Sequence, residues 1–281
     1  MQDLAGRIAV VTGGASGIGR SLALAFAREG MHVAISDIDH AAAQAVASEV
    51  EDVGVKALAI QTDVADPSSV ADLVSAVYDE FSNAHIVCNN AGVVTFKLAQ
   101  DMTAVDWDWV LDVDLYGVVH GVLEFLPRML ASGEPGHFVN TASIAGVIPA
   151  VTPGIIAYTA AKHGVVGLSE AMQLDLADTE IRVSVVCPGG VATRIADSQR
   201  NRQARYGAPE KREPVPGEST PHAVMEPEQL AQHVLAAIRD ERLYVFSHPD
   251  LQPPLEARYE SLFSAIDAFA ALDPRKDPKN S

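Results

Sequence analysis

Short apolar runs alternate with longer amphipathic segments through most of the chain. The runs are rich in valine, isoleucine and alanine, which is typical of strands buried on both faces, and they span 7–12, 32–37, 56–63, 85–90, 137–143, 182–189 and 243–248. Segments with helical periodicity lie between and after them at 17–30, 39–54, 67–81, 104–131, 155–178 and 227–240. This alternation predicts an α/β fold with a doubly wound parallel sheet of about seven strands and helices on both faces.

Two regions depart from this alternation. Residues 193–227 are polar and contain several prolines, and loops of that length are usually functional lids or disordered segments. Residues 250–281 contain apolar side chains at helical spacing, which predicts a C-terminal helix that packs on its own domain, followed by a frayed tail. With no linker or internal repeat in view, residues 1–281 are expected to form one domain, with 193–227 as a lid over the substrate.

Composition narrows the classes of partner. The chain has 281 residues and a net charge of −17, so nucleic acid and anionic membrane surfaces are not expected as partners. Cys88 and Cys187 end apolar runs and read as small buried thiols, which favours a reducing, cytoplasmic setting. No signal-peptide or membrane-span pattern is found. The nine histidines show no HExxH spacing and no CxxC motif occurs, so no metal site is expected.

A glycine-rich turn follows the first predicted strand. In "VVTGGASGIGR" (10–20), Gly13, Gly17 and Gly19 lead from the strand into a helix, where glycine lets the backbone approach a pyrophosphate. The second strand ends in Asp37, which can accept hydrogen bonds from an adenosine ribose and repels a 2′-phosphate. No lysine or arginine follows directly, so NAD is favoured over NADP. Asp37 could instead cap the next helix, a role that Asp39 would fill equally well.

A tyrosine and a lysine lie one helical turn apart in "AYTAAKHG" (157–164). Tyr158 and Lys162 share a helix face because positions i and i+4 coincide. A cation at about 4 Å, with an effective dielectric near 20, stabilises a phenolate by about 4 kcal/mol, or about three pKa units. Tyr158 is therefore expected to act as a general base in alcohol oxidation and as a general acid in ketone reduction. Ser143, at a strand end, is expected to hold the substrate oxygen beside it, although a lone serine there could equally be a turn residue.

Together these motifs resemble the short-chain dehydrogenase/reductases. TGxxxGxG (12–19), "NNAG" (89–92), Ser143, YxxxK (158–162) and "PGGVAT" (188–193) occur in the order of that family, over roughly residues 5–250. The resemblance implies a Rossmann-type fold and catalysis by Ser143, Tyr158, Lys162 and Asp114. It places Asp63 and Val64 beside the adenine and the "PGGVAT" residues at the nicotinamide. The implied cofactor-binding residues are Gly13, Ser16, Gly17, Ile18, Gly19, Asp37, Asp63, Val64, Asn90, Gly92, Tyr158, Lys162, Pro188, Gly189, Val191 and Thr193.

The chain departs from the family pattern at two places. Asp114 occupies a position where the family usually has asparagine, whose backbone carbonyl holds a water that leads to the lysine. A backbone role would survive the change, whereas a role for the charge would alter the chemistry, and both alternatives stay open here. The interval from Ser143 to Tyr158 is also longer than usual, with the extra residues in the apolar segment "VIPAVTPGII".

The expected reaction is NAD-dependent interconversion of a hydrophobic, bulky or aromatic secondary alcohol and its ketone. Apolar residues are expected to line the substrate pocket, and "RMLASGEPGHFVNTAS" and "LYVFSHPD" resemble a bacterial subgroup that includes dehydrogenases of bulky aryl alcohols. The expected pocket residues are Val94, Ile144, Ala145, Val151 and Ile155. An NADPH-dependent ketoreductase is an alternative that Asp37 disfavours. A non-catalytic dinucleotide-binding regulator would not need the Ser–Tyr–Lys set.

Assembly and the lid give two further expectations. The family resemblance implies a homotetramer or homodimer formed through 104–131 and 155–178. Between 194 and 212 the predicted lid is rich in arginine, in contrast to the acidic chain as a whole. These arginines either rest against the acidic body or bind an anionic group of the substrate.

Overall fold

The computed structural model describes residues 1–148, 152–217 and 224–270. The chain forms two compact units, Met1–Ser247 and His248–Ser281. Three parts of the sequence discussed above lie outside the described residues: Val151, a portion of the predicted lid, and the predicted tail. The expectation that the whole chain forms one domain stays a prediction. No helix among the described residues is both long and apolar enough to cross a membrane.

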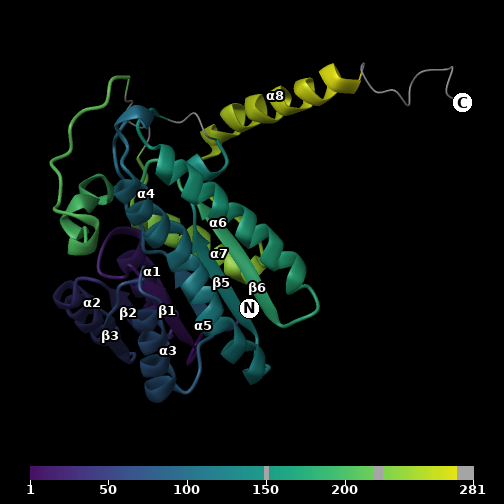
Figure 1. Ribbon diagram of the computed structural model, residues 1–281. Coiled ribbons are helices and arrows are strands. Elements are labelled where there is room, and N and C mark those ends of the chain that lie inside the picture. Colours follow the sequence, from purple (N-terminus) through teal and green to yellow (C-terminus); the bar gives the residue numbers. More distant parts are fainter. Residues whose placement is uncertain (149–151, 218–223, 271–281) are drawn as a thin grey trace, which may run out of the picture. The chain divides into compact units, whose positions relative to one another are not determined.

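The first unit is built on a parallel sheet of seven strands in the order β3-β2-β1-β4-β5-β6-β7 (Figure 1). All neighbouring strands pair in parallel, so the predicted doubly wound sheet is confirmed. The chain order reverses at β1 and β4, which are neighbours, and this opens a crevice at the carboxyl ends of the strands. The strands are β1 (Ile8–Thr12), β2 (His32–Asp37), β3 (Ala57–Gln61), β4 (Ile86–Asn89), β5 (Gly136–Thr141), β6 (Ile181–Cys187) and β7 (Tyr244–Phe246).

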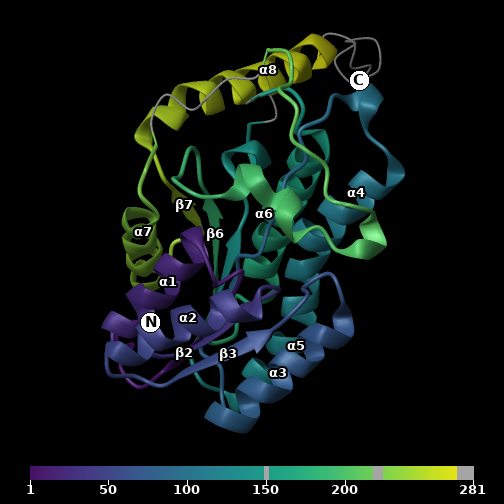
Figure 2. The ribbon, with the colours of Figure 1, turned by 90° about the vertical axis from the view of Figure 1, so that its left-hand side faces the viewer.

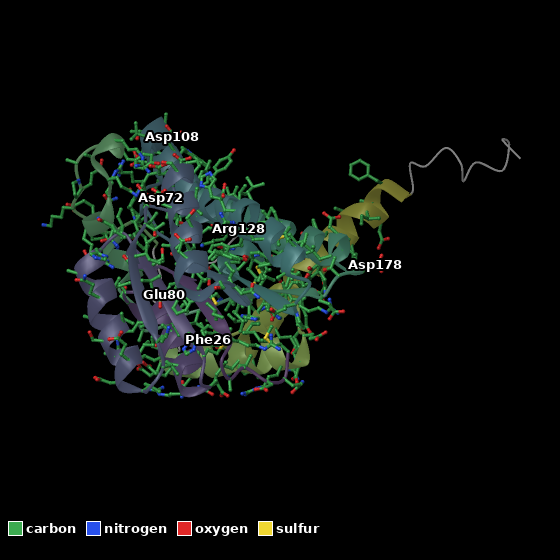
Figure 3. All side chains as sticks on the ribbon, turned by 90° about the horizontal axis from the view of Figure 1, so that it is seen from below. Phe26, Asp72, Glu80, Asp108, Arg128 and Asp178 are labelled. Carbon is green, nitrogen blue, oxygen red and sulfur yellow. The ribbon has the colours of Figure 1, made fainter. Side chains whose placement is uncertain are left out.

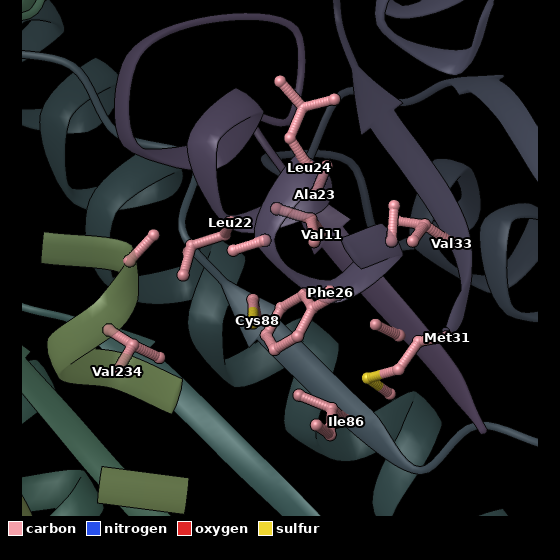
Figure 4. Packing of buried hydrophobic residues seen from close by; sticks show 14 of the residues in the cluster. Val11, Leu22, Ala23, Leu24, Phe26, Met31, Val33, Ile86, Cys88 and Val234 are labelled. Atoms are coloured by element: carbon pink, nitrogen blue, oxygen red, sulfur yellow. The ribbon is translucent and has the colours of Figure 1, made fainter. Parts of the chain in front are cut away.

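Helices cover both faces of this sheet because successive strand side chains point in opposite directions. Val11 packs with α1 (Gly17–Arg28), α2 (His40–Asp52) and α7 (Pro227–Asp240). Its neighbour Val10 packs with α3 (Pro67–Phe81), α5 (Gly117–Ser132) and α6 (Ile156–Asp175) on the other face (Figure 2). Figure 4 shows Phe26 of α1 next to Cys88 and Ile86 of β4. Burying a side chain of that size stabilises the fold by roughly 2–3 kcal/mol.

The helix predicted over 104–131 is divided. A helix α4 (Ala104–Leu111) is followed by a π-helical turn (Asp112–Tyr116) and then by α5. Thr103 starts α4 with a capping box that includes Asp106. The π-helical turn was not predicted, because hydrophobic periodicity does not register one extra residue in a turn, and such turns are frequent at functional sites. This turn contains Asp114.

The segment after β6 contains two short 3-10 helices, Ile195–Asn201 and Ala204–Tyr206. In the second unit, a 3-10 turn (Pro249–Leu251) precedes α8 (Gln252–Ala270), so the predicted C-terminal helix is confirmed. Its packing on the chain's own domain stays a prediction.

Candidate active site

The glycine-rich turn joins β1 to α1 through positions where a side chain would not fit. Gly13 has φ of 63°, and a Cβ atom there would lie 2.8 Å from the Cα of Ala91. A Cβ on Gly19 would lie 2.1 Å from the Gly13 carbonyl oxygen. Ser16 precedes α1 without a side-chain cap in the described structure, so the first N–H groups of the helix are left for an anion.

A cavity of about 320 Å³ opens at this turn and extends along the carboxyl ends of the strands. It gathers all but two of the predicted catalytic and cofactor-binding residues: Gly13, Ser16, Gly17, Ile18, Asp37, Asp63, Val64, Asn90, Gly92, Ser143, Tyr158, Lys162, Pro188, Gly189, Val191 and Thr193. The two exceptions, Gly19 and Asp114, lie behind the lining. Gly19 packs on the glycine turn, and Asp114 lies behind Gly92.

Asp37, at the end of β2, hydrogen-bonds to the glycine-rich turn. Its carboxylate accepts hydrogen bonds from the backbone N–H of Ala15 (3.0 Å) and from that of Asp39 (3.0 Å). Burial raises the pKa of Asp37, and these N–H groups partly offset the effect. Capping of α2 falls to Asp39, which accepts from the N–H of Ala42 (3.1 Å). Asp37 is therefore not needed as the cap and faces the cavity.

Hydrogen bonds that Thr12 accepts link β1 to the segment after β4. The Thr12 hydroxyl accepts from the backbone N–H of Asn90 (2.9 Å) and of Ala91 (3.1 Å). The side-chain amide of Asn90 donates to the Thr12 carbonyl (3.0 Å), and the hydroxyl of Thr141 donates to Asn90 Oδ1 (3.3 Å). These contacts fix the relative positions of the strand ends at the crevice. The structural roles of Thr12 and Thr141 were not inferred from the sequence, although both end strands that meet at the crevice.

Ser143, Tyr158 and Lys162 meet on one side of the cavity. Ser143 begins a 3-10 turn (Ile144–Gly146) and accepts from the N–H of Ala145 (3.1 Å). Its hydroxyl also lies close enough to Tyr158 to lower the pKa of the phenol. It is thus both a turn residue and a partner of the tyrosine. Tyr158 and Lys162 share a face of α6, with the ammonium 5.5 Å from the centre of the phenol ring. Lys162 also donates to the carbonyl of Thr141 (2.9 Å).

The electrostatic environment of Tyr158 disfavours the phenolate on balance. Burial raises the pKa of Tyr158, Lys162 opposes that effect, and Asp114 adds to it. Taken together, the protein's own groups leave the pKa of Tyr158 above its ordinary value. The cation therefore acts in the expected direction without bringing the phenol near neutrality. Asp114 partly cancels it, since its carboxylate lies 3.2 Å from the Lys162 ammonium.

The segment after β6 is attached to the acidic body by several of its polar side chains. Arg202 pairs with Asp106 (2.9 Å), and Arg205 pairs with Asp63 (2.8 Å). Gln203 donates to Asp63 (2.9 Å), so two side chains of this segment hold the carboxylate predicted beside the adenine. Asp106 also binds Lys97 (2.9 Å). Arg202 and Arg205 thus rest against the acidic body, which is the first of the two alternatives for the arginine-rich segment.

Other residues of the same segment line the cavity. Arg194, Ile195, Arg200, Asn201 and Gln203 form part of its wall. One guanidinium nitrogen of Arg200 donates to two backbone carbonyls of the segment, those of residues 194 (2.9 Å) and 197 (2.7 Å). These lining residues were not singled out as cofactor contacts from the sequence, where only the positive charge of the segment gave a signal.

Apolar side chains adjoin the tyrosine. Val94, Ala145 and Ile155 form a buried cluster, and Phe96 and Tyr158 pack against it. Three of the five predicted pocket residues are thus brought together at Tyr158. Ile144 is buried but lies outside this cluster, and Val151 is outside the described residues. A second cavity, of about 290 Å³, is lined by Val94, Phe96 and residues 210–216.

Comparisons with known proteins find short-chain dehydrogenases. The family model "short chain dehydrogenase" matches residues 7–204. A C alpha-dehydrogenase of Sphingobium sp. is 32% identical over 288 residues, covering 100% of this chain and 92% of that protein. A cyclohexanol dehydrogenase of Acinetobacter sp. is 39% identical over 190 residues, covering 67% of this chain and 74% of that protein. The crystal structure of a short chain dehydrogenase/reductase from Burkholderia phymatum, in complex with NAD, superimposes with a TM-score of 0.88 at 32% identity, covering 94% of this chain and 97% of the other.

Proposed function

The chain belongs to the short-chain dehydrogenase/reductases, oxidoreductases that bind a nicotinamide dinucleotide, and on that premise we propose that it interconverts a hydrophobic secondary alcohol and its ketone with NAD. The observation that carries the proposal is the meeting of Ser143, Tyr158 and Lys162 in the cavity that also holds the uncapped start of α1. A dinucleotide would supply the hydride acceptor or donor, and its binding residues would be those that line this cavity.

In the proposed mechanism, Tyr158 exchanges the proton of the reacting hydroxyl. During oxidation its oxygen takes the proton from the alcohol, and during reduction it returns a proton to the carbonyl oxygen. Ser143, whose hydroxyl is close enough to Tyr158 to lower its pKa, holds the substrate oxygen at the same place. Lys162 favours the phenolate through its charge.

NAD is proposed over NADP because of Asp37. The Asp37 carboxylate lines the cavity at the end of β2, where a ribose 2′-hydroxyl could donate to it and a 2′-phosphate would be repelled. The described cations that line the cavity, Lys162, Arg194 and Arg200, come from α6 and the segment after β6. They do not come from the residues that follow Asp37. The NAD complex of the Burkholderia phymatum relative supports the same choice.

A bulky or aromatic substrate is proposed because the surroundings of Tyr158 are apolar. Val94, Ala145, Ile155 and Phe96 pack against it, and they offer few hydrogen-bond partners to a polar substrate. The names of the relatives, a C alpha-dehydrogenase and a cyclohexanol dehydrogenase, are compatible with such a substrate.

We also propose that the protein is a cytoplasmic homotetramer or homodimer. Large apolar side chains are exposed on or beside the helices that the family resemblance implies for assembly: Val105, Tyr116, Leu123, Leu130, Ile156 and Leu174. Multi-angle light scattering would measure the mass, and a monomer at micromolar concentration would contradict this part of the proposal. No cluster of His, Cys, Asp and Glu suited to a metal ion is found in the described part of the chain.

A panel of cyclic, aryl and aliphatic secondary alcohols, assayed with NAD and with NADP, tests the proposed function. We expect turnover with NAD and little with NADP. Tyr158→Phe should abolish turnover while the cofactor still binds, because only the proton-transferring hydroxyl is removed. Tyr259→Phe, which removes an exposed phenol hydroxyl on α8, is the matched control. Appreciable activity in Tyr158→Phe, or no turnover of any alcohol or ketone by the wild type, would contradict the proposal.

A further inference from the structure

Asp114 places a buried carboxyl group directly against Lys162. Burial raises the pKa of this carboxyl group, and the charge of Lys162 and the N–H of Val93 oppose that rise and favour its ionised form. The Asp114 side chain is 0% exposed and that of Lys162 is 2% exposed. One carboxylate oxygen accepts from the N–H of Val93 (2.7 Å), and the other lies 3.2 Å from the lysine ammonium. The ammonium also donates to the carbonyl of Thr141 (2.9 Å). The lysine is thus held between a carboxylate and a backbone carbonyl, and its nearest anion is Asp114.

The local backbone makes this pair possible. Asp114 lies on the π-helical turn between α4 and α5, and Lys162 reaches it from α6 past Gly92. A Cβ atom on Gly92 would lie 3.4 Å from the lysine ammonium and 3.5 Å from the carboxylate. Because the pair is enclosed on these sides, water screens it little, and its two charges largely cancel at a distance.

This pairing weakens the effect of Lys162 on the neighbouring Tyr158. A lone buried cation beside Tyr158 would stabilise the phenolate strongly, whereas a cation already paired with a carboxylate stabilises it much less. The other groups that face Tyr158 do not replace the lost charge. Ser143 is a neutral hydroxyl, and burial raises the pKa of the Cys187 thiol to about 12, which keeps it neutral at physiological pH.

We propose that Asp114 is a positioning residue whose carboxylate neutralises Lys162. As a result, catalysis through Tyr158 favours ketone reduction at neutral pH and alcohol oxidation at alkaline pH. The inference rests on the proposed function and adds a direction to it. In reduction, a bound reduced dinucleotide would supply the hydride for the carbonyl carbon, while the Tyr158 O–H bond breaks to protonate the carbonyl oxygen. The phenolate that remains recovers its proton from solvent. A tyrosine that holds its proton firmly suits this direction, because it stays protonated as the pH rises.

Asp114→Asn is the first test. Asparagine keeps an oxygen for the N–H of Val93 and removes the charge. We expect the apparent pKa that governs kcat/KM for alcohol oxidation to fall by about one unit, with about a tenfold gain in oxidation below that pKa. Ketone reduction should begin to fall at correspondingly lower pH. Superimposable pH profiles for Asp114→Asn and the wild type would overturn the inference.

Asp112→Asn is the matched control. It removes the same charge from the same π-helical turn, but the Asp112 carboxylate accepts from the hydroxyl of Tyr206 (2.7 Å) and not from Lys162. We expect its pH profile to match that of the wild type. A shift in Asp112→Asn equal to that in Asp114→Asn would show a general charge effect and would also overturn the inference.

A titration without turnover separates this inference from the proposed function. Ionisation of Tyr158 is followed by tyrosinate absorbance, as the difference between the wild type and Tyr158→Phe. We expect the wild-type midpoint to lie above about 10, the ordinary tyrosine value. The same difference, measured between Asp114→Asn and the double variant that also carries Tyr158→Phe, should give a lower midpoint. A wild-type midpoint well below about 10 refutes the inference even if Asp114→Asn does not fold. If the wild type turns over no alcohol or ketone, the proposed function fails, whereas turnover with unchanged midpoints refutes only the inference.

Discussion

Replacing Asp106 with asparagine should loosen the attachment of the lid segment to the body. Asp106 is 0% exposed and lies between Lys97 (2.9 Å) and Arg202 (2.9 Å), which come from the loop after β4 and from the segment after β6. It also accepts from the hydroxyl of Thr103 (2.7 Å) within the capping box of α4. Arg202 lies over the ring of Trp109 at 5.0 Å. One carboxylate thus joins three segments of the chain.

The size of the effect follows from the pKa of this group. Burial alone would raise the pKa of Asp106, but Lys97, Thr103 and Arg202 together lower it to about 2. Against an ordinary value of about 3.9, the drop corresponds to about 2.5 kcal/mol of stability at neutral pH. Removing one member of a buried ion pair typically costs about 3–5 kcal/mol, because the partner charges stay buried. We therefore expect Asp106→Asn to lower the free energy of unfolding by about 3 kcal/mol.

Urea unfolding of the wild type, Asp106→Asn and Asp108→Asn measures this loss. Asp108 is exposed on the same helix (Figure 3), so its substitution removes an equal charge without the buried pairs. The contribution of Asp106 should be fully present above the unfolded-state pKa of about 4 and should be lost as the pH falls towards 2. The reasoning is refuted if Asp106→Asn loses no more than Asp108→Asn at neutral pH. It is also refuted if the difference between Asp106→Asn and the wild type does not shrink in acid.

Three further predictions concern the cofactor, the packing and the behaviour in acid. Asp37→Ala should narrow the preference for NAD over NADP in kcat/KM, and an unchanged ratio would remove Asp37 as its cause. Gly121→Ala should destabilise by about 1–3 kcal/mol, because its Cβ would lie 2.1 Å from Asn89 Oδ1, whereas Gly167→Ala, with nothing within 4 Å, should be neutral or stabilising in thermal unfolding. Burial lowers the pKa of His137 to about 3. Between about pH 6.5 and pH 3 this histidine is therefore protonated in the unfolded chain but neutral in the folded chain. Stability should thus fall as the pH drops from about 6.5 towards 3, and urea unfolding should show a smaller fall in His137→Gln.

The sequence alone determined the features that arise from local pattern. Apolar runs predicted the strands, since a strand buried on both faces has to be apolar throughout. Gly13, Gly17 and Gly19 predicted the turn, because closely spaced glycines between a strand and a helix are typical of a phosphate-binding turn. Tyr158 and Lys162 were predicted to share a face from helical geometry alone. In each case the physical constraint acts between residues close in the sequence.

Only the tertiary structure decided which distant charges meet. Asp114 and Lys162, and likewise Asp63 and Arg205, pair because the sheet order and the π-helical turn bring their segments together. Neither periodicity nor composition specifies such a distance, and the charge of Asp114 could not be assigned a role without it. The electrostatic energy between two groups depends on their separation and burial, and both are set by the packing of whole elements.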